Sequence, residues 1–239
     1  MQAITLLPFK IWILLIAGPA LFLLAIMVAS IYFSARNVAA TELANHVTAL
    51  TPHILFTVLL SLGLLLIIVT PKITEIWRVP YGAKLYSDIL LGIAVGAILA
   101  TIYLQWLSPL LKYLQTHYGD YVPAGSVLPT LSGSLLIFFL ANVLLAPAVE
   151  ETLYRGLALP QLTTAFGAAG AVVITCIFFG LLHWLGGFWY MLLTGIVAGG
   201  VFAGLYTWRE GIIAPYVAHL TLNIIEFLYA WRTQHLTMQ

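Results

Sequence analysis

The chain has 239 residues, of which 62% are hydrophobic and only 7% are charged, and its formal net charge is +1. Soluble globular domains carry about 25% charged residues, so this chain offers too little polar surface to cover a soluble globule. Its balanced charge provides neither a basic surface for nucleic acid nor an acidic tail. We therefore expect an all-α, polytopic transmembrane bundle in the lipid bilayer, with no nucleic-acid partner.

Apolar segments follow one another along the whole chain. A membrane-spanning helix needs about 20 apolar residues, and the sequence predicts about seven such helices, with eight as the alternative, at residues 11–33, 54–69, 89–107, 131–161, 168–185, 188–208 and 212–231. The first is too long for the apolar region of a cleaved signal peptide. No internal repeat or linker divides the sequence, which predicts a single integral membrane domain over residues 1–239.

One further segment, at residues 108–118, is too short and too polar to span a membrane. Its leucines alternate with Lys112, Gln115 and His117. This pattern predicts an amphipathic helix that lies at the membrane interface.

The distribution of Lys and Arg predicts how the protein is oriented, because basic loops stay on the cytoplasmic side of a membrane. The loop at residues 70–87 contains Lys72, Arg78 and Lys84 and is the most basic loop of the chain. Placing it in the cytoplasm puts the N-terminus in the cytoplasm and the C-terminus outside. The short loops and the lack of a targeting extension favour a bacterial inner membrane.

Three charged residues lie within the fourth predicted span, in the sequence A-P-A-V-E-E-T-L-Y-R-G. A charge at the centre of a membrane helix costs at least about 2.5–3.5 kcal/mol, so each charge needs a partner or a function. Glu151 and Arg155 are four residues apart on one helix face, which predicts an ion pair. Glu150 points about 100° away and has no local partner. A carboxylate in such a setting is suited to act as a general base or acid.

Two further spans contain polar residues. Phe179 and His183 are four residues apart near the end of the fifth span, and His219 and Asn223 have the same spacing in the last one. A single His or Asn in a membrane helix usually forms an interhelical hydrogen bond. Polar groups on three apolar helices together instead favour a functional site.

Two more polar residues share these helix faces. Glu226 follows His219 by seven residues, and Asn142 precedes Glu150 by eight. Glu226 is either a neighbour of the site or a charge in the lipid headgroups. Asn142 is either a neighbour of the site or part of an interhelical hydrogen bond.

Helix geometry predicts which of these groups meet. If the chain turns near Gly167, Glu150 and His183 both lie about 20 Å from that turn, at about 1.5 Å per residue, and therefore at the same depth. A straight sixth helix would leave Asn223 about 10 Å away from that level. A strong tilt, or a break at one of the sixth segment's glycines (195, 199, 200 or 204), would close the gap.

The three ordered patterns E-E-x-x-x-R (Glu150, Glu151, Arg155), F-x-x-x-H (Phe179, His183) and H-x-x-x-N (His219, Asn223) resemble the motifs of the CPBP (Abi) family. That family contains CAAX prenyl-protein endopeptidases and bacteriocin-processing proteases. The resemblance covers about residues 146–226 and implies a protease-like core at about 131–231. It implies an intramembrane endopeptidase whose substrate is a membrane-associated protein or peptide: a prenylated CAAX-like tail, a peptide leader or a C-terminal sorting signal.

The resemblance also implies roles for the motif residues. Glu150 would take a proton from water, and His183 would hold and polarise that water. His219 and Asn223 would stabilise the oxyanion, while Glu151 and Arg155 would fix the position of Glu150. This glutamic mechanism is favoured and needs no cofactor.

Three alternatives remain open. In the metal-dependent version Glu150, His183 and His219 would bind zinc, although the sequence has no H-E-x-x-H pattern. A proton-coupled transporter would use the membrane Glu and His residues as a relay. A non-catalytic immunity or binding protein would use them only for contact.

Overall fold

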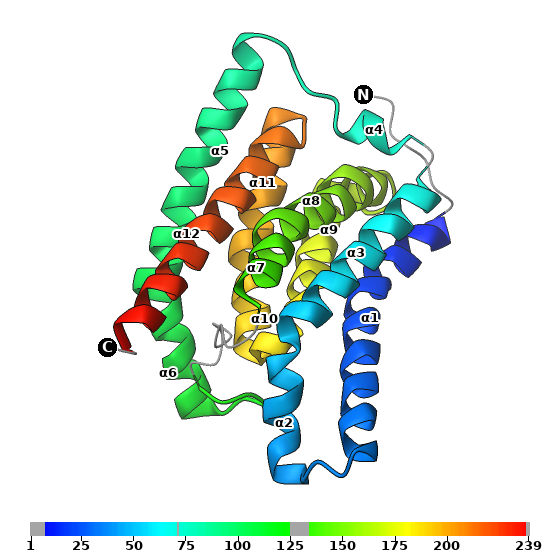
Figure 1. Cartoon of the computed structure of the whole chain (residues 1–239). Helices are drawn as coiled ribbons and strands as arrows, with labels where there is room; N and C mark the ends of the chain where they lie inside the picture. The colour runs from blue at the N-terminus through cyan, green and yellow to red at the C-terminus, as the bar shows by residue number, and fades with distance from the viewer. Residues whose placement is uncertain (1–7, 71, 125–133, 238–239) are drawn as a thin grey trace.

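The computed structural model describes residues 8–70, 72–124 and 134–237. The predicted all-α fold is confirmed, because every regular element in these residues is helical (Figure 1). The first half of the chain contains α1 (Pro8–Ala35), α2 (Ala40–Ala49), α3 (Thr51–Val69), α4 (Ile73–Ile76), α5 (Ala83–Ile102), η1 (Tyr103–Leu107) and α6 (Ser108–Tyr118). The second half contains α7 (Leu135–Phe138), η2 (Phe139–Leu145), α8 (Ala146–Glu150), η3 (Glu151–Ala158), α9 (Leu159–Leu182), η4 (Trp184–Gly186), α10 (Phe188–Thr194), η5 (Gly195–Gly199), α11 (Gly200–Arg209) and α12 (Ile213–Thr237).

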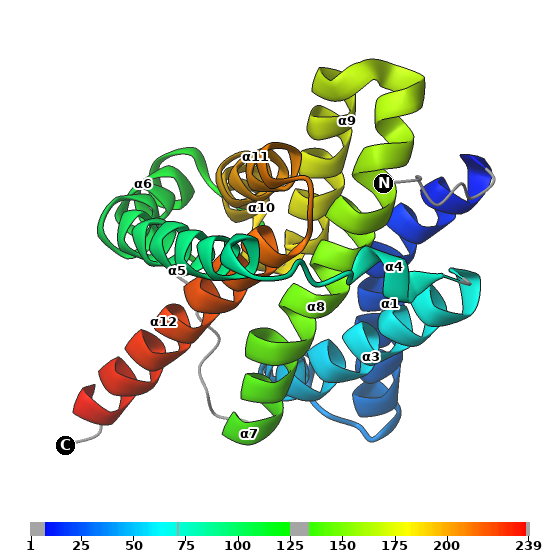
Figure 2. The ribbon, with the colours of Figure 1, turned by 90° about the horizontal axis from the view of Figure 1, so that it is seen from above.

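The described residues form six helical stretches that are long and apolar enough to cross a membrane. Seven were predicted, and the difference lies in the stretch Leu135–Leu182, which is interrupted at Gly167. Gly167 has φ 70° and ψ 169°, a conformation that glycine adopts without steric cost. The chain reverses there (Figure 2), so the predicted turn is confirmed. Residues 131–133, which the prediction placed in the fourth span, lie outside the described residues.

The outer surface of the bundle is apolar. Ile68 is 77% exposed, Leu90 is 66% exposed and Ile31 is 65% exposed. Such side chains are stable outside the core when they face lipid rather than water. Together with the spanning stretches, this surface supports an integral membrane protein.

The helix predicted at residues 108–118 is present as α6, but it is not separated from the span before it. α5, η1 and α6 form one continuous helical stretch of 36 residues, Ala83–Tyr118. Pro109, in the first turn of α6, cannot donate a backbone hydrogen bond. The wider π-helical turn of η1 precedes this position, so the helix continues through the proline instead of ending before it. The short helix α2 was not predicted.

Close contacts between small residues hold the helices that carry the motifs. A Cβ atom at Gly92 would lie 2.8 Å from the backbone oxygen of Ala214, and one at Gly96 would collide with the backbone oxygen of Ala218. α5 and α12 therefore approach as closely as their backbones allow. A Cβ atom at Gly180 would likewise lie 2.6 Å from the backbone oxygen of Met191. This contact sets α9 directly against α10.

The sixth span is not broken at its glycines, but it becomes π-helical at Gly195–Gly199. Figure 1 shows α12 crossing the bundle obliquely. The tilt that the sequence analysis required to bring His219 and Asn223 toward His183 is therefore present. Two further π-helical segments, η2 and η3, lie on either side of Glu150, and such segments often occur at functional sites.

Candidate active site

Glu151 lies at the centre of the buried polar groups. Its Oε1 accepts a hydrogen bond from Nη1 of Arg155 at 3.3 Å and another from Nδ1 of His219 at 2.9 Å. The ion pair predicted between Glu151 and Arg155 is therefore confirmed. His219 was not predicted to join it, because helix spacing within one segment says nothing about a residue 68 positions later.

Arg155 is buried, with only 1% of its surface exposed. Its Nη2 donates to the backbone oxygen of Gly199 at 2.9 Å, and its guanidinium carbon lies 4.5 Å from the ring centre of Phe179 and 5.4 Å from that of Phe202. A buried charge is tolerated only with a counter-ion and further polar contacts, and aromatic faces add to its stabilisation. Arg155 thus joins η3 to η5.

His219 is held between two aromatic rings. It stacks on Phe202 with ring centres 4.8 Å apart and meets the edge of Phe179 at 5.8 Å. Because Glu151 is the ionised partner of Arg155, it accepts the hydrogen that lies on Nδ1 of His219. The Nε2 atom of His219 is then available to a bound molecule.

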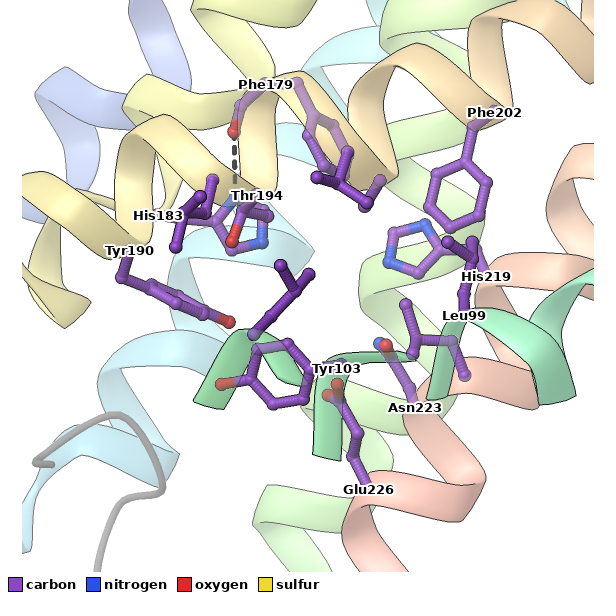
Figure 3. Close-up of a pocket in the computed structure, with 15 residues that line it drawn as sticks. Leu99, Tyr103, Phe179, His183, Tyr190, Thr194, Phe202, His219, Asn223 and Glu226 are labelled. Atoms are coloured by element: carbon purple, nitrogen blue, oxygen red, sulfur yellow. Dashed lines mark hydrogen bonds between the residues drawn. The ribbon is translucent and has the colours of Figure 1, made fainter. Parts of the chain in front are cut away.

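His183 follows the last residue of α9. Its Nδ1 lies 2.8 Å from the backbone oxygen of Phe179, as the dashed line in Figure 3 marks. A carbonyl oxygen can only accept, so Nδ1 carries the hydrogen and Nε2 keeps a free lone pair. The ring of Tyr190 packs against His183 with centres 5.9 Å apart. The predicted F-x-x-x-H spacing therefore sets the tautomer of this histidine.

Glu150 does not take part in the contacts of Glu151. It is 4% exposed, and its Oε2 has no hydrogen-bond partner among the described residues. It borders a cavity of about 720 Å³ that is also bordered by His183, His219 and Asn223. The structure thus brings all four predicted site residues to one cavity.

Asn223 joins α12 to η2. Its Nδ2 donates to the backbone oxygen of Asn142 at 2.7 Å. One amide hydrogen is used in this contact and the second is available to a bound molecule. Asn142 therefore takes part in an interhelical hydrogen bond through its backbone, and it also borders the same cavity as Glu150, so both readings of this residue are met.

One family model matches the chain. It is described as "Type II CAAX prenyl endopeptidase Rce1-like", and it matches residues 132–225. This segment, which is less than half of the chain, is similar to that family. The family recognised from the three motifs is therefore confirmed, and the match supports a protease. No curated protein and no solved structure matches the chain.

Two tyrosines at the cavity were not among the predicted site residues. Tyr190 borders it together with His183, and Tyr103 from η1, outside the matched segment, faces Tyr190 with ring centres 6.4 Å apart. Glu226 borders the same cavity. The sequence signal that could have found the two tyrosines is a hydroxyl group within an apolar span, but such residues are common at membrane interfaces.

The metal-dependent alternative finds no matching arrangement in the Rce1-like segment. Among the residues that the structure describes, no group of three His, Cys, Asp or Glu side chains lies close enough together to hold a metal ion. Glu150, His183 and His219 share a cavity but do not converge as three ligands do.

Proposed function

We propose that the protein is an intramembrane endopeptidase that hydrolyses a peptide bond of a membrane-associated protein or peptide. The observation that carries this proposal is the unpartnered carboxylate of Glu150, which borders one cavity with His183 and His219 inside the Rce1-like segment. A buried carboxylate without a partner is costly in a membrane protein. A reacting water molecule would give it one.

Water activation is the first step of the proposed reaction. Glu150 takes a proton from a water molecule, and the free lone pair on Nε2 of His183 accepts a second hydrogen bond from the same water. The water oxygen then forms a bond to the carbonyl carbon of the peptide. The electron pair of the carbonyl double bond moves to its oxygen, which becomes an oxyanion.

In this proposal two groups on α12 stabilise that oxyanion. Asn223 keeps one amide hydrogen after its bond to Asn142. His219 donates from Nε2 when its ring carries both hydrogens, with Glu151 as the counter-ion. One such donor typically contributes about 10²–10³ in rate.

Collapse of the intermediate completes the reaction. The proton held by Glu150 passes to the nitrogen of the peptide bond, the carbon–nitrogen bond breaks, and the carboxylate of Glu150 is restored. Glu151 and Arg155 act as positioning residues, since they join η3 to α12 and to η5 and so hold the reacting groups in place.

The cavity suits a substrate that comes from the membrane. Much of its lining is apolar and comes from α1, α2, α3, α7 and α12, including Phe22, Ile26, Leu55, Phe138 and Phe227. Binding of a lipidated or apolar peptide segment is favourable there, because its apolar surface is buried against the apolar lining. We propose a prenylated CAAX-like tail, a peptide leader or a C-terminal sorting signal as the substrate, and a bacterial inner membrane as the location.

The experiment that tests this function uses the purified full-length protein in detergent. A farnesylated CAAX-type peptide and a peptide with an apolar leader are incubated with it, and the products are identified by mass spectrometry. We expect cleavage of at least one peptide and its loss in Glu150→Gln. The control Glu42→Gln removes the same charge at an exposed position on α2. Cleavage that persists in folded Glu150→Gln would refute the mechanism.

A further inference from the structure

The second carboxylate at the cavity is not used by the proposed reaction. Glu226 lies on α12 one turn beyond Asn223, and it borders both the large cavity and a smaller recess of about 50 Å³. The residues that border both spaces are Tyr103, His183, Tyr190, His219, Asn223 and Glu226. We call these six residues the polar recess. Figure 3 shows Glu226 next to Tyr103 and Asn223.

No described Lys or Arg side chain borders the polar recess. Glu226 has no hydrogen-bond or ion-pair partner among the described residues. Glu150 and Glu226 are the acidic residues that border the two spaces, and no described Lys or Arg borders either of them. Arg155 lies nearby but is engaged by Glu151 and by the backbone of Gly199. A cation that enters would therefore meet two carboxylates and no Lys or Arg side chain.

Aromatic rings border the same recess. Tyr103 and Tyr190 meet edge to face, and Tyr190 also contacts His183. Tyrosine rings attract a cation through their faces and pack against the aliphatic part of a Lys or Arg side chain. A carboxylate beside two tyrosine rings therefore matches the chemistry of a basic side chain better than that of an acidic or purely apolar one.

We propose that Glu226, with Tyr103 and Tyr190, selects substrates that carry a Lys or Arg close to the cleaved bond. The proposal rests on the endopeptidase function proposed above and names a chemical feature of its substrate. Glu226 is about 10 Å along α12 from His219, and an extended peptide advances about 3.3 Å per residue. The basic residue would therefore lie within about three residues of the cleaved bond.

Binding tests the proposal without requiring cleavage. The probe is a fluorescent apolar peptide in which Lys, Gln or Glu is placed at each successive position. The affinity of each peptide for the Glu150→Gln variant, which should bind without cleaving, is measured by fluorescence anisotropy in detergent. We expect the Lys peptide to bind about tenfold more tightly than the Gln peptide at one or two adjacent positions, and the Glu peptide to bind most weakly.

Two variants assign the preference to Glu226. In Glu150→Gln/Glu226→Gln the Lys and Gln peptides should bind alike, and in Glu150→Gln/Glu226→Lys the order should reverse in favour of the Glu peptide. Glu150→Gln/Glu42→Gln is the matched control and should keep the preference. A melting curve of each variant shows that it is folded.

The outcomes separate this proposal from the proposed function. A Lys preference that survives Glu226→Gln, or no Lys preference at any position, would overturn the role of Glu226 even if the native protein cleaves peptides. A Lys preference that depends on Glu226 supports the role. If the native protein then cleaves none of the bound peptides, the endopeptidase function fails and the cation selectivity stands.

Discussion

The side chains of Glu151 and His219 meet at 2.9 Å between Oε1 and Nδ1, although 68 positions separate them in the chain. This contact divides the two adjacent glutamates into different roles. Glu151 holds Arg155 and His219, whereas Glu150 faces the cavity without a partner.

Substitution of Glu150 should mainly affect activity, whereas substitution of Glu151 should also affect stability. Glu150→Ala should abolish peptide cleavage with little change in melting temperature, because its Oε2 makes no hydrogen bond. Glu151→Ala should lower the free energy of unfolding by about 3–5 kcal/mol, because it leaves the buried charge of Arg155 unpaired. It should lower activity as well. Thermal unfolding and cleavage are measured on the same detergent preparations. An unstable Glu150→Ala beside a folded but inactive Glu151→Ala would reverse the assignment.

The double variant Glu151→Gln/Arg155→Gln should recover part of the stability lost in Glu151→Ala. The double variant leaves no unpaired charge beside the ring of Phe179. Removing both partners of a buried ion pair costs less stability than removing one of them. The melting temperatures of the two variants are compared. A double variant that melts below Glu151→Ala would contradict the prediction.

The contact between α5 and α12 should tolerate no added methyl group. Gly96→Ala would place a Cβ atom against the backbone of Ala218, one residue before His219. Overpacking of this kind costs about 1–3 kcal/mol, and the shift of α12 should also reduce cleavage. Gly204→Ala is the matched control, because nothing lies within 4 Å of its Cβ position. It should be neutral or slightly stabilising. Equal melting temperatures for the two variants would contradict the packing argument.

Asp120 should make stability depend on pH in the acidic range. Burial acts to raise the pKa of this carboxyl group, but the N–H donors of Phe188, Tyr121 and Trp189 outweigh it, so the pKa lies below its ordinary value of 3.8. The stabilisation is therefore complete above the unfolded pKa and is lost as the pH falls through the lower, folded pKa.

The measurement is the difference in melting temperature between the native protein and Asp120→Ala. It should stay constant from about pH 7 to pH 5 and shrink below about pH 4, where the unfolded carboxyl group begins to be protonated. Asp120 accepts from the first residues of α10, at 2.8 Å from the nitrogen of Phe188. A melting-temperature difference that grows toward low pH would show that the N–H donors around Asp120 do not favour its charged carboxylate.

Membrane topology gives a prediction that needs no substrate. The basic loop with Lys72, Arg78 and Lys84 should be cytoplasmic. With seven spans, counting Leu135–Leu182 as two helices that meet at Gly167, the C-terminus lies outside. A C-terminal fusion to a reporter enzyme that works only outside the cytoplasm should therefore be active. A cytoplasmic signal would favour an even number of spans.

Removal of metal should leave peptide cleavage by the purified protein nearly unchanged if Glu150 alone activates water. A stringent chelator is added, the protein is passed through a desalting column, and cleavage is measured before and after zinc is returned. Inactivation by the chelator with recovery in zinc would instead make His183 and His219 metal ligands in the working enzyme.

The sequence by itself determined the membrane class, the helical fold, the turn at Gly167 and the ion pair between Glu151 and Arg155. These features depend on composition or on residues close together in one segment, where helix geometry converts spacing into direction. The three motifs also identified the family, because residue type and spacing are read without knowing any contact.

Only the tertiary structure decided the contacts between segments. Spacing could not show that Glu151 reaches His219, that Arg155 bonds to the backbone of Gly199, or that Glu226 borders the same cavity as Glu150. These contacts depend on the tilt of α12, on the backbone approach at Gly92 and Gly96, and on π-helical turns that shift the direction of later side chains. Each arises from packing between helices, which local spacing does not encode.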